Sequence, residues 1–576
     1  MKIEILLIGI TALAAVSSCQ KSTGTDDGAA DRILIGNVIT MDKDSTVAQA
    51  VAFKDGKVLF VGSKEDAQKY RGKHTDVANY GTASIYPGFM DGHTHGYLAA
   101  QRYMEADLSV IDYTPGAQMS DFVAAMKKYM DENPGRDMYK GSGWSIKNGV
   151  LPTAAMLDAI CPKVPMLLNS GDGHSMWVNA AAMEKFGIDE SWVKKYGTDC
   201  VRVDDKGNIT GYISEAPAFV LIKATALSKE KCMEGLLKWQ DYAFSRGITA
   251  TTEAATNLGS GTASTAYVNL AASPLWKLRT YAVETISESV SDAKLDSALN
   301  KVLQLHQDNN GEYFQVTGVK VFVDGIVEAH TAWLKQEYSN ESGYYGLKRC
   351  SDPVRVAKIV EFANRNGMNV HFHCIGDGAT ALAVEGIVNG QNAAGVKDGR
   401  NTIAHLQLVS PGDIRKMADN HIIAVLAPQW ALLNNDGYNL IERYIGSDRA
   451  KTMFPIKSFV EAGALINLHS DYPVSVPLSI QQNFFAAICG SVEVSKEVLW
   501  NRNAKELTER YPALQAVTIN VAHQWGQDDR LGSLEVGKVA NAVVCDADFL
   551  KDDVEKILAS RILETIVDGQ TVYSFK

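Results

Sequence analysis

The chain has 576 residues, of which 46% are hydrophobic and 21% charged, a composition typical of a folded globular protein and not of a disordered one. Its length allows two or more domains, or one large α/β barrel with additions. The formal net charge of −11 argues against a nucleic-acid partner, because a phosphate-binding surface requires clustered Lys and Arg. The sequence contains no such cluster.

The amino terminus resembles the signal peptide of a bacterial lipoprotein. Lys2 precedes a short apolar run at 5–16, and Val16-Ser17-Ser18-Cys19 places small residues before a cysteine. The run is shorter than the ~20 residues that span a bilayer. The resemblance implies cleavage of residues 1–19 before Cys19, a lipid on Cys19 and a flexible tether over 20–31. We therefore expect a lipid-anchored protein of the bacterial cell envelope, on the periplasmic side or at the outer membrane; an ordinary soluble signal peptide is the alternative.

The remaining seven cysteines are scattered, without the spacing of a disulfide framework or a zinc ribbon, so we expect buried thiols. Short strand-like segments stand at both ends of the rest of the chain. We expect a small β-sandwich domain formed by 32–84 and 530–576, with strands at 33–35, 50–53, 58–61, 542–545, 562–567 and 571–575.

The middle of the chain alternates apolar strand-like runs with amphipathic helical stretches. Helical patterns at 352–366, 410–420 and 454–462 separate apolar runs at 316–323, 368–373, 402–405, 422–426 and 465–470. This alternation predicts parallel βα units and, over 85–529, a (β/α)8 barrel with its chemistry at the carboxyl ends of the strands. The segment from about residue 96 to residue 245 is too long for one βα loop, so we expect an insertion after the first strand.

Polar residues with metal-binding or acid–base chemistry lie at or near the ends of these predicted strands. His93 and His95 are two positions apart, so on a strand they face the same side and can bind one metal ion. Each residue alone also has a structural interpretation, as a hydrogen-bonded core histidine, a snorkelling lysine or a helix-capping aspartate. Their shared placement at five strand ends, counting His93 and His95 as one site, is hard to explain by these structural roles alone. The other residues at these sites are Lys320, His371, His373, His405, His469 and Asp471.

Six segments resemble, in order, motifs of the amidohydrolase superfamily of metal-dependent hydrolases, and within it of YtcJ-like proteins and N-substituted formamide deformylase. They are PGFMDGHTH, VKVFVDGIVEAHTAWL, VHFHCIGDGA, TIAHLQ, HSDYPV and GSLEVGKVANAVV. The resemblance runs from about residue 33 to the end. The chain departs from the pattern at Asn541, where an aspartate is usual, and near Glu328–Thr331, where an arginine commonly precedes Thr-Ala.

The resemblance implies a set of metal ligands: His93, His95, Lys320, His373, His405 and Asp471. It implies one or two divalent ions, with zinc expected, and carbon dioxide bound to Lys320 as a carbamate that bridges the ions. The hydroxide between the ions would be the nucleophile, and Asp471 would act as base and then as acid. His371 would support the site without binding metal. In the alternative, Lys320 forms a salt bridge with Asp324 and a single ion is bound by the histidines and Asp471.

Four further residues are candidates for contacts with the substrate. His174 lies in a segment, 169–179, that resembles a motif of the same branch, and it could stabilise an oxyanion as a second catalytic residue. Glu215 ends a glycine-to-glutamate motif, and pairing with an arginine is its structural alternative. Trp144 could line the pocket or pack in a core. His330 lies at the position where the branch pattern changes.

The function that we expect is hydrolysis of a carbon–nitrogen bond other than a peptide bond, in an N-acyl, N-formyl or related amide, through a metal-bound hydroxide. A cyclic-amide hydrolase or a deaminase on the same scaffold is an alternative, because a fold does not settle the substrate. A non-catalytic binding lipoprotein is a third interpretation. We expect a small-molecule amide as partner, no nucleic acid, membrane contact through the lipid anchor alone, and a homodimer as a candidate assembly.

Overall fold

The computed structural model describes residues 28–576 except 113–115, 148, 172, 174, 257–261, 476, 495–496 and 502. The predicted lipidation site Cys19, the signal peptide, most of the tether and His174 lie outside the described residues. Within the described part of the chain, no helix is both long and apolar enough to cross a membrane. The seven described cysteines are free thiols, and five of them are buried.

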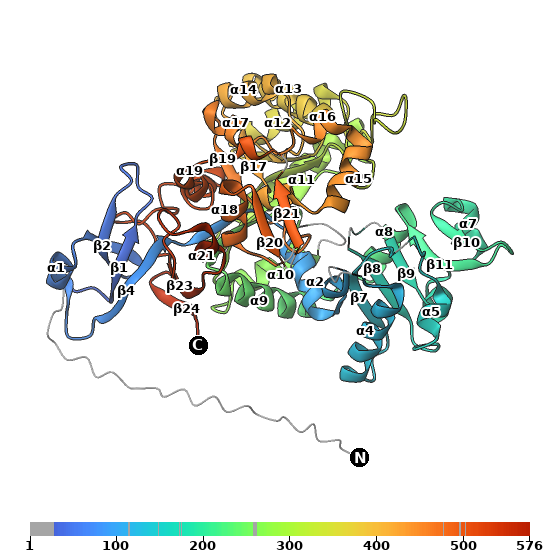
Figure 1. Cartoon of the computed structure of the whole chain (residues 1–576), viewed down its shortest axis with the longest axis horizontal. Helices are drawn as coiled ribbons and strands as arrows, with labels where there is room; N and C mark the ends of the chain where they lie inside the picture. Colours follow the sequence, from blue (N-terminus) through green and yellow to red (C-terminus); the bar gives the residue numbers. More distant parts are fainter. Residues whose placement is uncertain are drawn as a thin grey trace, which may run out of the picture.

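A barrel of eight parallel strands forms the centre of the molecule (Figure 1). Two backbone hydrogen bonds join the first and last strands, from Asp471 N to His93 O (3.0 Å) and from His95 N to Tyr472 O (2.8 Å). The predicted barrel is therefore confirmed, and its ring closes at the carboxyl ends of the strands. The strands are β5 (Phe89–Thr94), β12 (Ile248–Glu253), β13 (Arg279–Thr285), β14 (Phe314–Phe322), β15 (Asn369–Cys374), β16 (Thr402–His405), β17 (Ile423–Leu426) and β19 (Ile466–Leu468).

Helices in the barrel connections bury one apolar face each. In α12 (Pro353–Arg365), the side chain of Asp352 accepts a hydrogen bond from Val354 N, Pro353 occupies the first turn, and the buried residues recur at helical spacing. Gly386 and Gly390 of α13 (Asp377–Ala394) allow that helix to pack closely on α12. The others are α9 (Lys229–Ser245), α10 (Thr262–Ala271), α11 (Asp292–Asp308), α14 (Pro411–Asp419), α17 (Ile456–Glu461), α18 (Ile480–Ile488), α19 (Arg510–Gln515) and α20 (Ile519–Gln524).

A seven-stranded sheet combines both ends of the described chain, in the order β24-β23-β22-β4-β1-β2-β3. Its strand β4 pairs with β22 from the other end and leads through Gly88 into barrel strand β5, so the sheet fixes the entry to the barrel. A side chain at Gly88 would collide with Thr249. The strands are β1 (Arg32–Ile39), β2 (Val47–Lys54), β3 (Lys57–Gly62), β4 (Asp76–Pro87), β22 (Ala542–Cys545), β23 (Ile562–Val567) and β24 (Gln570–Ser574).

The insertion after β5 has its own sheet, in the order β10-β11-β9-β8-β7-β6. It lies on the side of the barrel away from the seven-stranded sheet (Figure 1). Asn179 caps its helix α6 by accepting a hydrogen bond from Ala182 N (2.9 Å). Its strands are β6 (Ala106–Asp107), β7 (Tyr139–Trp144), β8 (Met166–Ser170), β9 (Ser175–Val178), β10 (Val201–Val203) and β11 (Ile209–Ser214). Its helices are α2 (Gly96–Met104), α3 (Ser109–Asp112), α4 (Met119–Glu132), α5 (Ala154–Asp158), α6 (Ala180–Phe186), α7 (Glu190–Tyr196) and α8 (Ala216–Ala224).

The remaining elements pack against the barrel connections, the seven-stranded sheet and one another. A small sheet has the order β18-β21-β20, from Leu432–Leu433, Glu497–Asn501 and Ser491–Val494. The other helices are α1 (Lys64–Ala67), α15 (Asn435–Ile445), α16 (Ser447–Ala450) and α21 (Val554–Leu558), with 3-10 turns η1 (Gln68–Tyr70), η2 (Pro428–Ala431) and η3 (Ala504–Glu506).

Candidate functional site

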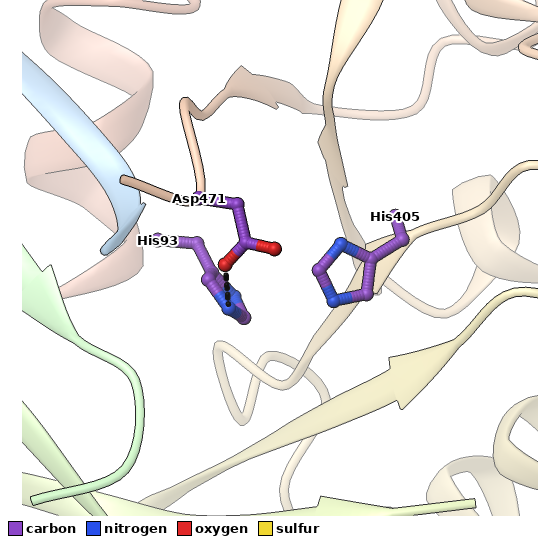
Figure 2. Close-up of side chains that lie close together, drawn as sticks. All are labelled: His93, His405 and Asp471. Carbon is purple, nitrogen blue, oxygen red and sulfur yellow. Dashed lines mark ion pairs between the residues drawn. The ribbon is translucent and has the colours of Figure 1, made fainter. Parts of the chain in front are cut away.

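Three buried side chains meet at the carboxyl end of the barrel: His93 from β5, His405 from β16 and Asp471 after β19. One donor atom of each lies within 4.8 Å of the donor atoms of the other two. In Figure 2 the Asp471 carboxylate has one oxygen on His93 and the other toward the His405 ring. The first oxygen is 3.1 Å from Nε2 of His93 and 3.1 Å from Nε2 of His95. Four of the six predicted ligands therefore converge.

The backbone at two of these residues has the left-handed conformation, with φ of 79° at His405 and 56° at Asp471. This conformation is unfavourable for residues with a side chain and persists only where the surroundings enforce it. Asp471 N donates to His93 O, and Leu406 N donates to Cys374 O at 2.9 Å. These backbone bonds hold both side chains turned toward the barrel axis.

Lys320 lies on β14 in the barrel interior, fully buried, and its Nζ has no hydrogen-bond partner. Burial lowers its pKa to about 7, so the neutral amine is accessible. Asp324 does not pair with it. The Asp324 carboxylate accepts hydrogen bonds from the backbone N–H groups of Trp333 (2.9 Å), Ile375 (3.0 Å) and Gly376 (2.8 Å). The structure thus contradicts the Lys320–Asp324 salt bridge, because that carboxylate already organises the loop after β15.

The two histidines of β15 have different surroundings. His371 Nε2 is 2.7 Å from Nδ1 of His93, and His371 Nδ1 is 2.7 Å from Thr402 Oγ1. Burial lowers the pKa of the His93 and His371 rings, so both are neutral. A free lone pair on His93 Nε2 requires the proton on its Nδ1, which then donates to His371, and His371 donates in turn to Thr402. His373 lies beside His405, with ring centroids 4.5 Å apart, and its Nε2 is 3.2 Å from Gly325 O.

Asp91 and Glu253 are buried carboxylates for which the sequence alone gave no role. Asp91 accepts the N–H groups of His93 and Ser470, both at 3.1 Å, and burial raises its pKa to about 7. It thereby ties the end of β5 to the loop that carries Asp471. Its spacing of two residues from His93 is the signal that could have placed it on the same face. Glu253, the last residue of β12, accepts Tyr97 N at 3.2 Å and supports the turn after His95.

His469 is an additional imidazole in the barrel interior. Its ring centroid lies 5.0 Å from those of His93 and His405, which are 4.9 Å from each other. Neither ring nitrogen has a hydrogen-bond partner, and burial lowers the pKa to about 4, so the ring is neutral. The nitrogens of His469, His405 and His95 and the amine of Lys320 are likewise buried without partners, as potential ligands are before an ion binds. The group whose donor atoms lie close enough together to hold an ion is His93, His405 and Asp471.

A cavity of about 940 Å³ lies between the barrel and the insertion. His95 belongs to its wall, together with Tyr97, Ser142, Asn169, Thr285 and Phe322. The cavity therefore joins the candidate metal ligands to a space large enough for a small organic molecule.

The structure places the predicted substrate-binding residues in different environments. Trp144 is buried in the core of the insertion, where its Nε1 donates to Leu168 O at 2.8 Å, so the prediction that it lines the pocket is wrong. His330 lies outside the cavity wall, with its ring centroid 4.1 Å from that of Tyr338 and Nε2 3.1 Å from Asn340 Oδ1. This aromatic packing leaves it no contact with the cavity.

Glu215 is exposed immediately before α8, with φ of 59°. The residues that follow, Ala216 and Phe219, belong to the cavity wall, whereas Glu215 does not. The position predicted for His174 lies outside the described residues, so its role as an oxyanion donor stays a prediction.

The barrel and the buried His, Asp and Lys donors at its carboxyl end define the class of metal-dependent hydrolases with a (β/α)8 fold. Residues 83–573 match the model of the amidohydrolase family, and the chain belongs to this family. It is 25% identical to the putative amidohydrolase YtcJ of Bacillus subtilis (strain 168), over 93% of this chain and 98% of that protein. It is 24% identical to the N-substituted formamide deformylase of Arthrobacter pascens, over 94% and 98%.

Among solved structures, the chain is similar to an uncharacterized metal-dependent hydrolase from Pyrococcus horikoshii OT3, with a TM-score of 0.72. The alignment covers 91% of this chain and 99% of the other, at 20% sequence identity. The resemblance inferred from the sequence motifs is therefore confirmed for the family and for the fold.

Proposed function

We propose that the protein hydrolyses a carbon–nitrogen bond other than a peptide bond, in an N-acyl or N-formyl amide of a small molecule. One observation carries the proposal: buried donors with unpartnered nitrogens lie beside a cavity of about 940 Å³. The likeness to N-substituted formamide deformylase, over almost the full length of both chains, supports an amide as substrate.

His93, His95, His405 and Asp471 would bind a divalent ion, with zinc as the proposed metal, and His373 and Lys320 would contribute to a second ion. The bound metal would polarise the amide carbonyl and lower the pKa of a water molecule. Burial alone would raise the pKa of Asp471, but the imidazoles around it, His95 first, hold that pKa below its ordinary value. Asp471 is therefore ionised, and it would take the proton of the attacking water and deliver it to the leaving nitrogen.

Lys320 is the residue for which a covalent modification is proposed. Its neutral amine would attack carbon dioxide, forming an N–C bond and releasing one proton, and the resulting carbamate has the negative charge that a metal ligand needs. The lowered pKa of the buried amine and its missing hydrogen-bond partner support this step.

Metal content and turnover test the proposed function together. We expect purified protein to contain zinc and to hydrolyse members of a panel of N-formyl and N-acyl amides. Removal of the metal by a chelator should abolish turnover, and zinc should restore it fully only with bicarbonate present. Lys320→Met should bind less zinc per chain than the wild type. Full restoration with a single equivalent of zinc in bicarbonate-free buffer would contradict the carbamate.

The cellular location is proposed from the sequence alone. The small residues before Cys19 support lipidation there and attachment to the envelope membrane. The wild type should sediment with membranes, and Cys19→Ala should block processing or release the protein. An unlipidated wild-type protein in the soluble fraction would contradict the anchor.

A further inference from the structure

The cavity between the barrel and the insertion has more cationic than anionic side chains, although the chain as a whole has 56 Lys and Arg against 67 Asp and Glu. Both carboxylates of its wall are already paired, because Glu105 contacts Lys140 and Glu288 lies 2.8 Å from Arg349. Two cations, Arg102 and Lys223, remain in excess. This local surplus of positive charge is the opposite of what the overall composition would give.

Arg102 is the stronger of the two cationic groups. Its side chain is only 11% exposed, and its Nη1 is buried without a hydrogen-bond partner. Its Nε lies 3.8 Å from Oδ1 of Asp107, but that oxygen already accepts Ser109 N (3.0 Å) and Ser109 Oγ (2.6 Å). A buried guanidinium N–H without an acceptor is costly. Its place on a cavity wall therefore indicates that a bound molecule supplies the acceptor.

Lys223 of α8 also belongs to the wall of this cavity. It is exposed, and in the part of the chain that the structure describes it has no ion pair. Phe219 and Ile222 of the same helix also belong to the wall. The cavity thus combines apolar surface with two cations: Lys223, which has no ion pair among the described residues, and Arg102, whose ion pair with Asp107 is long, at 3.8 Å.

We infer that the substrate of the proposed amide hydrolysis has an anionic group, of the carboxylate type, that Arg102 binds and Lys223 attracts. A guanidinium matches the two oxygens of a carboxylate, and hydrogen bonds between charged groups are about twice as strong as neutral ones. Arg102 follows His95 by seven positions, which is about 10 Å along α2, so the anionic group lies at the end of the substrate away from the scissile bond. This inference rests on the proposed function.

A series of matched substrates tests the inferred anionic group. N-formyl ω-amino acids of increasing chain length would be compared with their carboxamides, which have the same shape without the charge. We expect kcat/KM to favour the carboxylate roughly 10- to 100-fold at one optimal chain length, because a charged hydrogen bond is lost in the carboxamide. The difference should lie mainly in KM, since the anion contacts Arg102 equally in the ground state and the transition state.

Variants assign the effect to particular residues. Arg102→Gln should bring the carboxylate and carboxamide values together, and Arg102→Lys should keep part of the preference. Lys223→Gln should lower kcat/KM for the carboxylate by roughly 2- to 5-fold, with the loss reduced at high salt, because an exposed charge acts by long-range attraction. Lys206→Gln, at an exposed turn of the insertion outside the cavity wall, is the matched control and should have no effect. Zinc content should be unchanged in all four variants.

Two results overturn the inference while leaving the proposed function intact: equal hydrolysis of carboxylate and carboxamide, or a preference that survives Arg102→Gln. If no amide is hydrolysed, the proposed function fails, and calorimetry with N-formyl-6-aminohexanoate then tests the anion site by itself. Binding that Arg102→Gln weakens would support the site. Absence of binding, or equal binding by the variant, would refute it.

Discussion

The barrel mouth and the insertion differ in how their polar side chains are held. At the mouth, Lys320 and His469 are buried without hydrogen-bond partners, and His93 is held through His371. In the core of the insertion, the buried polar groups of Trp144 and Asn179 are satisfied by nearby backbone groups, whereas Nη1 of Arg102 at the cavity wall has no partner. Buried polar groups are normally paired, so the unpaired set marks the place where a ligand completes the structure.

We expect this difference to correspond to two roles, with catalysis at the barrel mouth and substrate selection at the insertion. The proposed metal ligands come from the ends of several parallel strands, whose positions the barrel fixes. The insertion contributes other residues of the cavity wall, such as Ser142, Asn169 and Phe219. We expect changes at the mouth to remove metal and turnover, and changes in the insertion to alter stability or substrate choice with the metal retained.

The largest effect is expected for Asp471→Asn. The substitution keeps the shape of the side chain and removes the charge that lies 3.1 Å from both His93 and His95. Turnover should fall by at least about 10³-fold, because the base is lost together with a metal ligand. Zinc content and kcat of the purified variant measure the effect, and circular dichroism should report an intact fold. Wild-type turnover would mean that the mouth is not the catalytic centre.

A smaller effect is expected for His371→Asn, which removes the ring that supports His93. Partners of metal-binding histidines typically contribute about 10- to 100-fold in metal affinity. The zinc dissociation constant should rise by that factor, while kcat at saturating zinc should change little. Thr402→Val, one hydrogen bond further from the metal, should give a weaker effect of the same kind. An unchanged zinc affinity in His371→Asn would contradict the role of this chain of hydrogen bonds.

The sequence predicts the barrel mouth better than the insertion for a physical reason. Strands such as 402–405 are short apolar runs ended by a functional side chain, so their bounds in the structure match the expected ones. Strand β7, Tyr139–Trp144, contains two glycines and a serine in a row of three small residues, so it has no clear strand pattern. The small sheet β18-β21-β20 also escaped prediction.

The same contrast applies to single residues of the site. The spacing of His93 and His95 identifies them because it is local. Asp91 accepts an N–H from Ser470, 379 positions away, and such a partner leaves no local pattern. For Trp144 the sequence leaves two interpretations open, a pocket wall and a packed core, and the fold decides for the core.

Trp144→Ala tests whether a change in the core of the insertion affects stability without affecting the metal. The side chain is buried against Trp177 and Tyr212, with ring centroids 5.9 and 6.2 Å away. Its loss should lower the free energy of unfolding by about 3 kcal/mol or more, because a large cavity forms in the core. Zinc content should stay at the wild-type level. The unfolding transition in denaturant measures the first quantity, and a variant that loses zinc would show that the two regions are not independent.

The smallest effect is expected at the opposite end of the barrel. His523 of α20 lies between two carboxylates, with Nε2 3.1 Å from Asp398 and Nδ1 3.1 Å from Asp528. The helix lies at the amino-terminal end of the strands, because Gln524 O accepts a hydrogen bond at 3.2 Å from Asn369, the first residue of β15. The pKa of His523 is raised mainly by its hydrogen bond to Asp398, and the pairing with Asp528 raises it further.

A pKa raised in the folded state gives stability that is complete below the ordinary pKa of about 6.5 and is lost as the pH rises through the raised value. His523→Gln should therefore lower Tm at pH 5.5, and the difference from wild type should shrink above pH 8. Since His523 is partly exposed, the shift should be a few degrees at most. Turnover and zinc content should not change, because this end of a barrel contributes to stability and not to chemistry. A pH-independent Tm difference would show that packing, and not charge, accounts for the contribution of His523.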